Sequence, residues 1–302
     1  MNTLVNRRGF LKSSGVLIAG AAVAGLWNGR SVNAEPVKIS TPNAEKLGWQ
    51  MSVATYSYRR FPLYEALDKI AALGVRHIEP AFFLKLDKAR PTLQINENLT
   101  ADVRKEFKSK LADMGISMSS FYSSLGTDED KAKKIFEFCK EMGAGTIVAE
   151  PPDNAFDMIE KLCEEYKINV GIHNHPEKAN YKNWKPENVL ELCKNRSKRI
   201  GGCCDTGHWV RSGLDPVECL KKMEGRIVSF HLKEAAEMGN RKSPDSILGE
   251  GKGNYRGVLT ELKRQGYKGI TAVEYENDTP TLQEEMAKNV AFVENMAKEL
   301  AG

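Results

Sequence analysis

The sequence predicts an α/β fold, a (β/α)8 TIM barrel built as a single domain, and three observations lead to it. Eight short segments, most of them rich in Val, Ile, Ser or Ala, recur along the chain, each five to seven residues long. They have the pattern of buried parallel strands, because their apolar residues do not alternate regularly with polar ones. A helix-like segment follows each of them, and eight such units in about 250 residues are typical of this barrel.

In chain order, the predicted strands comprise residues 50–56, 75–79, 116–122, 146–150, 169–173, 200–205, 227–231 and 269–274. The helices between them have recognisable ends. Asp215-Pro216 and Thr279-Pro280 each place a capping side chain before a proline at the first helical position. Glycines stand where four helices should end, each just before a strand: Gly74, Gly115, Gly143 and Gly266. An open, doubly wound sheet is disfavoured, because residues 56–60 after the first strand contain no glycine-rich turn.

The charge of the chain is unevenly placed. Lysine and arginine number 44 against 40 acidic residues, which gives a formal net charge of +4. Residues 1–34 contain Arg7, Arg8, Lys12 and Arg30 and no acid, so the rest of the chain holds 40 bases and 40 acids. This balance removes the electrostatic support that a nucleic-acid partner would need. We therefore expect no nucleic-acid partner.

The basic end is predicted to be a twin-arginine signal peptide over residues 1–34, which leaves the barrel over residues 35–302. Arg7 and Arg8 precede an apolar stretch at residues 15–27, and Val-Asn-Ala at 32–34 resembles a cleavage site. An uncleaved anchor is the alternative, but the stretch is too short to span a bilayer well. We expect export by the twin-arginine machinery into the periplasm, with no stable membrane anchor after cleavage. A protein that folds before export would keep its cysteines as buried free thiols: Cys139, Cys163, Cys193, Cys203, Cys204 and Cys219.

Acids and imidazoles gather at the predicted strand ends. Glu150, Asp205, His231 and Glu274 end the fourth, sixth, seventh and eighth strands, and two positions before each acid stands a small or apolar residue. Side chains two positions apart on a strand point to the same side, so the acids and the small or apolar residues before them are expected to face the barrel interior. TIM-barrel active sites form at these carboxyl ends. Three carboxylates converging there would repel one another, and a divalent cation would compensate. Oxygen ligands with one imidazole suit Mn²⁺, Mg²⁺, Co²⁺ or Zn²⁺. The alternative is four separate structural residues.

Motifs at these strand ends resemble the xylose-isomerase-like TIM-barrel superfamily, and within it the sugar phosphate isomerase/epimerase family. They are Val148-Ala-Glu150-Pro, Cys204-Asp205-Thr-Gly-His208, Phe230-His231-Leu-Lys233 and Ala272-Val-Glu274, and the resemblance extends over residues 49–297. The resemblance implies that Glu150, Asp205, His231 and Glu274 ligate a divalent metal, for which Mn²⁺ is the first expectation. It also implies that Glu150 and Glu274 form an acid/base pair and that His208 contacts substrate.

Five further residues are candidates for substrate binding: Glu79, His173, Lys233, Trp209 and Arg211. Trp209 would suit stacking on a sugar face. His173 is equally well explained as a hydrogen-bonded structural histidine. Lys233 would orient a hydroxyl or carbonyl group, or would pair with Glu234. The glycine-rich segment 249–253 would cradle an anion or would simply form a turn.

The expected activity is that of a metal-dependent sugar isomerase or epimerase acting on a small carbohydrate. A metal bound to a carbonyl and its neighbouring hydroxyl would acidify the adjacent C–H, a carboxylate would take the proton, and an enediolate would form. A lyase or hydratase that expels the C1 substituent of a 3-keto-glycoside by β-elimination is the first alternative, and export favours it. A non-catalytic sugar-binding barrel is the second.

An endonuclease IV-like nuclease is disfavoured, because residues 119–122 end the third strand without a histidine. Isomerases of this type are often oligomeric, so a homo-oligomer is compatible with the resemblance.

Overall fold

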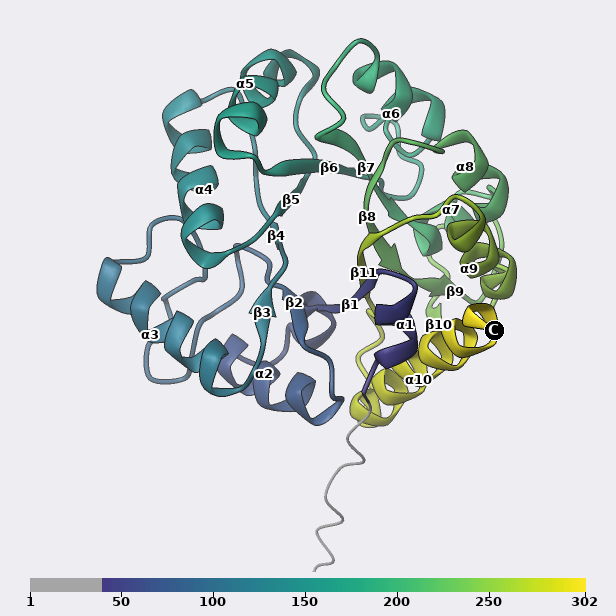
Figure 1. The fold of residues 1–302 in the computed structure, drawn as a ribbon, viewed down its shortest axis with the longest axis horizontal. Coiled ribbons are helices and arrows are strands. Elements are labelled where there is room, and N and C mark those ends of the chain that lie inside the picture. The colour runs from purple at the N-terminus through teal and green to yellow at the C-terminus, as the bar shows by residue number, and fades with distance from the viewer. Residues whose placement is uncertain (1–39) are drawn as a thin grey trace, which may run out of the picture. The chain divides into compact units, whose positions relative to one another are not determined.

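A computed structural model describes residues 40–302, and it confirms the predicted TIM barrel. The strands form one parallel sheet of nine segments in the order β3-β2-β1-β11-β8-β7-β6-β5-β4. Viewed down the barrel, the strands surround the centre and the helices form an outer layer (Figure 1). The segments are β1 (Trp49–Ala54), β2 (His77–Glu79), β3 (Ser117–Met118), β4 (Ser120–Tyr122), β5 (Thr146–Ala149), β6 (Asn169–His173), β7 (Ile200–Asp205), β8 (Ile227–Leu232) and β11 (Gly269–Val273).

The predicted third strand is interrupted at Ser119, and this interruption is where the barrel closes. β3 pairs with β2, whereas β4 pairs with β5, so the two ends of the sheet order are consecutive pieces of chain. Between them, the Ser119 amide donates to the Ile78 carbonyl at 3.1 Å, and the Ser119 carbonyl accepts from the Gly145 amide at 3.0 Å. All eight predicted strands are therefore present, and one of them joins the two edges.

The outer helices are α2 (Leu63–Ala72), α3 (Ala101–Asp113), α4 (Glu129–Met142), α5 (Phe156–Tyr166), α6 (Pro186–Cys193), α8 (Pro216–Lys222), α9 (Tyr255–Arg264) and α10 (Leu282–Ala301). Shorter elements are α1 (Pro42–Lys46), η1 (Thr55–Tyr58), η2 (Asp153–Ala155) and α7 (Thr206–Arg211). β9 (Glu234–Ala235) and β10 (Asp245–Ser246) form a small antiparallel sheet beyond β8.

The predicted helix signals are confirmed at one start and wrong at another. Asp215 caps α8 by accepting hydrogen bonds from the Val217 and Glu218 amides. Thr279 does not cap α10, because this helix begins at Leu282 and has Thr281 at its N-cap position; the Thr279 hydroxyl donates to Glu285. At the other end, Gly143 ends α4 with φ at +83°, in the left-handed region that glycine adopts most easily.

Apolar residues divide between a large core and a small interior cluster. The main core lies between the barrel and the helices, whereas Ala54, Ile270 and Ala272 form a separate buried cluster. Ile270 and Ala272 lie on the face of β11 predicted to point inward. The six cysteines are buried and free, as predicted.

Among residues 40–302, no helix combines the length and the apolar character needed to cross a membrane. The predicted signal peptide, residues 1–34, lies outside the described residues.

Candidate active site

A cavity of about 490 Å³ opens at the carboxyl ends of the strands. Its lining comes from strand ends and the loops that follow them, from η1 and α7, and from residues 241–243 between β9 and β10. This is where active sites of the fold form. Pockets of this volume accommodate organic molecules of moderate size.

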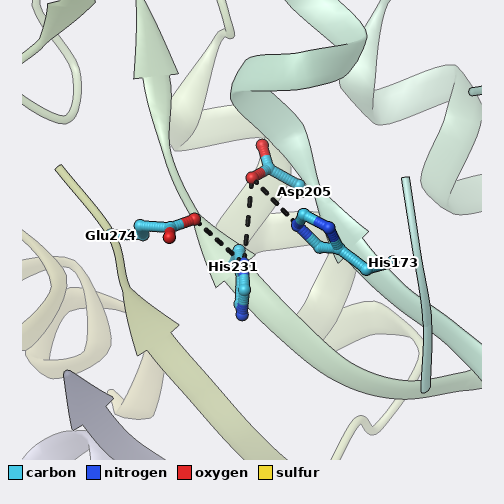
Figure 2. A group of neighbouring side chains, drawn as sticks. All are labelled: His173, Asp205, His231 and Glu274. Atoms are coloured by element: carbon cyan, nitrogen blue, oxygen red, sulfur yellow. Dashed lines mark ion pairs between the residues drawn. The ribbon is translucent and has the colours of Figure 1, made fainter. Parts of the chain in front are cut away.

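Four buried side chains meet at the inner end of this cavity: His173, Asp205, His231 and Glu274 (Figure 2). One donor atom from each lies within 4.8 Å of the others. His231 Nδ1 is 3.0 Å from Glu274 Oε2 and 3.8 Å from Asp205 Oδ2, and His173 Nε2 is 3.5 Å from Asp205 Oδ2. We call these residues the four-residue group. Three of them were predicted as metal ligands, and His173 was predicted as a substrate contact or a hydrogen-bonded structural histidine.

Four buried atoms converge in this group, and their polar contacts are chiefly with one another and with Lys233 Nζ. The four atoms are His173 Nε2, Asp205 Oδ2, His231 Nδ1 and Glu274 Oε2. Buried carboxylates and imidazoles that face one point are an arrangement that a shared cation stabilises. Two imidazole nitrogens and two carboxylate oxygens are donors that divalent metal ions accept, and the group therefore fits such an ion.

In His231 and His173, the ring nitrogen that points away from the four-residue group contacts a further carboxylate. His231 Nε2 is 2.7 Å from Glu79 Oε1, and Ser120 Oγ donates to Glu79 Oε2 at 2.6 Å. His173 Nδ1 is 2.9 Å from Glu150 Oε1. Burial opposes a charged His173, but its hydrogen bonds with Asp205 and Glu150 raise the pKa of this imidazole to about 10. Glu79, predicted to bind substrate, lies at the cavity but is almost fully buried.

Glu150 lies beside the four-residue group and not within it. It follows the last residue of β5, and its carboxylate accepts from the Tyr122 hydroxyl at 2.8 Å and pairs with His175 Nε2 at 2.9 Å, in addition to His173. Burial disfavours its charge, yet the hydrogen bonds from His173 and His175 hold the pKa of Glu150 well below its ordinary range. Its predicted roles as ligand and as acid or base stay predictions.

Lys233 is a fully buried cation behind the group. Its Nζ lies 3.1 Å from Asp205 Oδ2, 2.8 Å from Glu274 Oε2 and 2.5 Å from Glu276 Oε1. Burial opposes its charge, but these carboxylates, led by Asp205, raise the pKa of Lys233 well above its ordinary value. The predicted alternative, a pair with Glu234, does not form, and Lys233 is not among the residues that line the cavity.

Helix α7 presents two of its three predicted substrate residues to the cavity. The Asp205 carboxylate caps it by accepting from the His208 amide at 2.8 Å. His208 and Arg211 line the cavity, and an Arg211 Nη atom is 2.5 Å from Asp245 Oδ1. Burial lowers the pKa of His208 well below its ordinary value, so this imidazole is neutral. Trp209 is packed into the hydrophobic core and is not part of the cavity lining, so the prediction that it stacks on a sugar is wrong.

An aromatic wall, whose three rings no single sequence motif unites, faces the cavity instead. It consists of Tyr56, Phe83 and Tyr122, whose ring centroids lie 5.9 Å apart for Tyr56–Phe83 and 6.3 Å apart for Phe83–Tyr122. Tyr122 could have been predicted to line the site from its place at the end of the predicted third strand. Phe83 lies in the loop after β2, where no periodic pattern indicates which side chains turn inward.

The glycine-rich segment 249–253 holds a carboxyl group that belongs to the chain itself. The Gly253 amide donates to Glu234 Oε1 at 2.7 Å, and a Cβ atom on Gly251 would lie 2.6 Å from Glu234 Cγ. The buried carboxylate of Glu234 therefore fills the loop. The segment does not line the cavity, and no substrate anion can share this position.

The fold and the site define a class: a TIM barrel whose carboxyl end carries a cavity and a buried set of metal-type donors. Within that class, the chain belongs to the xylose isomerase-like TIM barrel family, whose model matches residues 67–296.

Two curated proteins illustrate its similarities. The chain is 30% identical over 134 residues to the uncharacterised protein MJ1311 of Methanocaldococcus jannaschii, a match that covers 43% of this chain and 45% of that protein. It is 26% identical over 197 residues to the probable endonuclease 4 of Thermoplasma acidophilum, covering 55% of this chain and 69% of that protein. The chain thus spans less than half the length of MJ1311.

Solved structures share the fold over most of the chain. A protein of unassigned function from Parabacteroides distasonis has 31% identity and a TM-score of 0.65, covering 82% of this chain and 98% of that one. A D-tagatose 3-epimerase-like protein has 19% identity and a TM-score of 0.62, covering 83% and 99%. The IolI protein, solved with a bound zinc atom, has 16% identity and a TM-score of 0.59, covering 83% and 97%.

Proposed function

We propose that this chain is a metal-dependent enzyme that removes a proton from the carbon next to a sugar carbonyl, as sugar isomerases and epimerases do. The observation that carries the proposal is the four-residue group, whose four donor atoms converge at the inner end of a cavity. His173, Asp205, His231 and Glu274 would hold a divalent ion, which supplies Lewis-acid chemistry by polarising the substrate carbonyl and acidifying the neighbouring C–H.

Glu274 is the residue we assign to take the proton. Of the two predicted acid/base carboxylates, it is the one that lines the cavity. Burial disfavours its charge, but Lys233, 2.8 Å away, and His231 keep the pKa of Glu274 well below its ordinary value, so the carboxylate is ionised and able to accept a proton. Its Oε2 belongs to the four-residue group, which leaves Oε1 for the substrate.

The remaining lining suits a carbohydrate. His208 and Arg211 offer N–H donors to hydroxyl groups, and Asp245 fixes the Arg211 guanidinium in place. The aromatic wall offers flat apolar faces of the kind on which the C–H surface of a sugar ring packs. The fold is also that of a D-tagatose 3-epimerase-like protein, which agrees with this class of substrate.

A second candidate uses the same base. In a 3-keto-glycoside, the C3 ketone acidifies the C2 hydrogen, and loss of the C1 substituent then cleaves the glycosidic bond. Phe83, 37% exposed at the cavity, would offer an apolar contact to an aglycone that extends beyond the sugar ring. This lyase reaction would take place in the periplasm, where we propose that the twin-arginine pathway delivers the protein.

The test is to incubate the full chain, loaded with each of several divalent ions, with free ketoses, with a methyl 3-ketoglucoside and with DNA containing an abasic site. New ketose or aldose isomers would establish the isomerase or epimerase, and released methanol would establish the lyase. Glu274→Gln should remove either activity, whereas Glu294→Gln, which changes a buried carboxylate that caps α1, should not. Cleavage of the DNA, or binding of metal and sugar without turnover of any substrate, would overturn the proposal.

A further inference from the structure

We propose that the substrate carries a carboxylate at the end distant from its reacting carbonyl, and that Arg241 and Lys242 at the outer end of the cavity bind this carboxylate. The substrate class is then an acidic carbohydrate, such as a uronic acid or its glycoside. The inference rests on the proposed function only in taking the substrate to be a carbohydrate whose carbonyl points toward the four-residue group.

The charges that line the cavity are unevenly compensated. Each acid among the lining residues has a basic partner of its own: Glu79 has His231, and Glu274 and Glu276 share Lys233. The lining arginine Arg211 is paired with Asp245. Arg241 and Lys242 also line the cavity, and neither forms an ion pair with any of residues 40–302. The cavity therefore presents two uncompensated positive charges.

These two cations and the four-residue group lie at different ends of the cavity. The four-residue group is buried at the inner end, whereas Arg241 and Lys242 are exposed and lie in the turn between β9 and β10. We call residues 237–243, which contain both cations, the rim segment. A molecule with a carbonyl at one end and a carboxylate at the other complements both ends of the cavity. Charge complementarity of this kind fixes the orientation in which a ligand binds.

The backbone of the rim segment is already held in place. The Glu237 amide donates to Ser243 Oγ at 2.9 Å, which closes the turn. The Gly239 amide donates to the Val210 carbonyl at 2.8 Å, and Arg211 Nε donates to the Ser243 carbonyl at 3.0 Å. The turn is thus tied to α7 at two points. Because this backbone is ordered before a ligand arrives, binding an anion requires only the two cationic side chains to become ordered.

The rim segment suits a carboxylate better than a phosphate. Phosphate sites in proteins are commonly built from backbone N–H groups that surround the anion. Here the Lys242 amide already donates to Asn240 Oδ1 at 3.0 Å, and the Ser243 amide donates to the Asn240 carbonyl at 2.9 Å. The side chains of Arg241 and Lys242 remain, and the planar fork of a guanidinium matches the two oxygens of a carboxylate.

The experiment compares D-fructose, D-fructuronate and D-fructose 6-phosphate, which share the C2 carbonyl and differ only at C6. Calorimetry measures the dissociation constant of each from the metal-loaded full chain at low ionic strength. We expect D-fructuronate to bind about tenfold more tightly than D-fructose, and more tightly than the phosphate ester, because two exposed charge pairs each contribute about threefold. About 0.5 M NaCl should remove most of this preference, because salt screens exposed charges.

Variants of the two cations test their part in this preference. Arg241→Gln and Lys242→Gln should each reduce the preference for D-fructuronate about threefold, and the double variant should abolish it, while the affinity for D-fructose stays unchanged. Arg76→Gln and Lys268→Gln are the matched controls, because these exposed cations precede β2 and β11 at the opposite end of the barrel. Both controls should keep the wild-type preference.

Three results would overturn the inference and leave the proposed reaction open. A preference for D-fructuronate that persists in the double variant would place its carboxylate on the metal ion. Equal affinity of the wild type for D-fructose and D-fructuronate would show that the cations bind no substrate group, and tighter binding of the phosphate ester would exclude the carboxylate. If the double variant loses the preference but no substrate is ever turned over, the proposed reaction fails and the carboxylate site stands.

Discussion

Replacing Lys233 with methionine tests whether the acids at the inner end of the cavity require a cation. The lysine is fully buried, and its Nζ is within 3.1 Å of Asp205, Glu274 and Glu276. Methionine keeps most of the apolar stem and removes the charge. In the absence of metal, Lys233→Met leaves Asp205 and Glu274 as buried carboxylates that have lost their shared lysine partner.

The magnitude follows from the burial of these groups. Removing one partner of a buried ion pair lowers the free energy of unfolding by about 3–5 kcal/mol when the charge left behind has no other partner. Because His231 Nδ1 still lies 3.0 Å from Glu274 Oε2, we expect a loss at the lower end of this range. A bound divalent ion would neutralise Asp205 and Glu274 and leave only Glu276, whose side chain is 29% exposed. A pair with a partly exposed carboxylate is worth about 1 kcal/mol or less. Saturating metal should therefore recover most of the stability lost in the variant.

The assay is urea unfolding of the wild type and of Lys233→Met, each in EDTA and in saturating Zn²⁺. Lys242→Met is the matched control, because Lys242 is an exposed lysine on the cavity wall, and its replacement should change stability by less than about 0.5 kcal/mol. The reasoning is refuted if Lys233→Met is as stable as the wild type in EDTA. It is also refuted if the variant loses the same free energy of unfolding with and without the ion.

Three further predictions follow from the same contacts. With free metal at about 100 times its dissociation constant, the wild type should have a free energy of unfolding about 2.7 kcal/mol higher than the metal-free protein. A thermal melt with and without EDTA measures this difference, and no shift with any ion would contradict the metal site. Phe83→Ala should raise KM and leave the free energy of unfolding nearly unchanged, whereas Trp209→Ala should lower the free energy of unfolding by about 3–5 kcal/mol. If Trp209→Ala instead raised KM without loss of stability, Trp209 would belong to the substrate site. Changing Arg7 and Arg8 to lysine should retain the protein in the cytoplasm, as fractionation would show, and unchanged export would exclude the twin-arginine route.

The fold could be predicted from the sequence because its information is local. Buried parallel strands and glycine-ended helices repeat along the chain. Each end of the eight predicted strands lies within about two residues of the end in the structure. The break at Ser119 was not predictable in this way. It depends on the Ser119 backbone bonding to β2 on one side and to the residue before β5 on the other, a relation between distant segments.

The site could be predicted only in part, for geometric reasons. Asp205 is the last residue of β7 and Glu274 directly follows β11. The alternation of side chains along each strand correctly placed both in the interior. The same alternation could not show that the Glu150 carboxylate is held by Tyr122 and His175, or that His173 from β6 takes the place beside Asp205. Trp209 directly follows His208 on α7, so it points about 100° around the helix from a cavity residue and into the core.

Solvent hydrogen exchange at the substrate carbon tests the central claim most directly, because it detects proton removal whichever product is later formed. The metal-loaded protein is incubated in D₂O with ketohexoses and with a methyl 3-ketoglucoside, and NMR follows deuterium at the carbon next to the carbonyl or, for an eliminating substrate, the loss of that C–H. We predict exchange or loss that requires the divalent ion, disappears in Glu274→Gln and persists in Glu294→Gln. Retention of that hydrogen in every substrate by a protein shown to bind metal and sugar would contradict the claim.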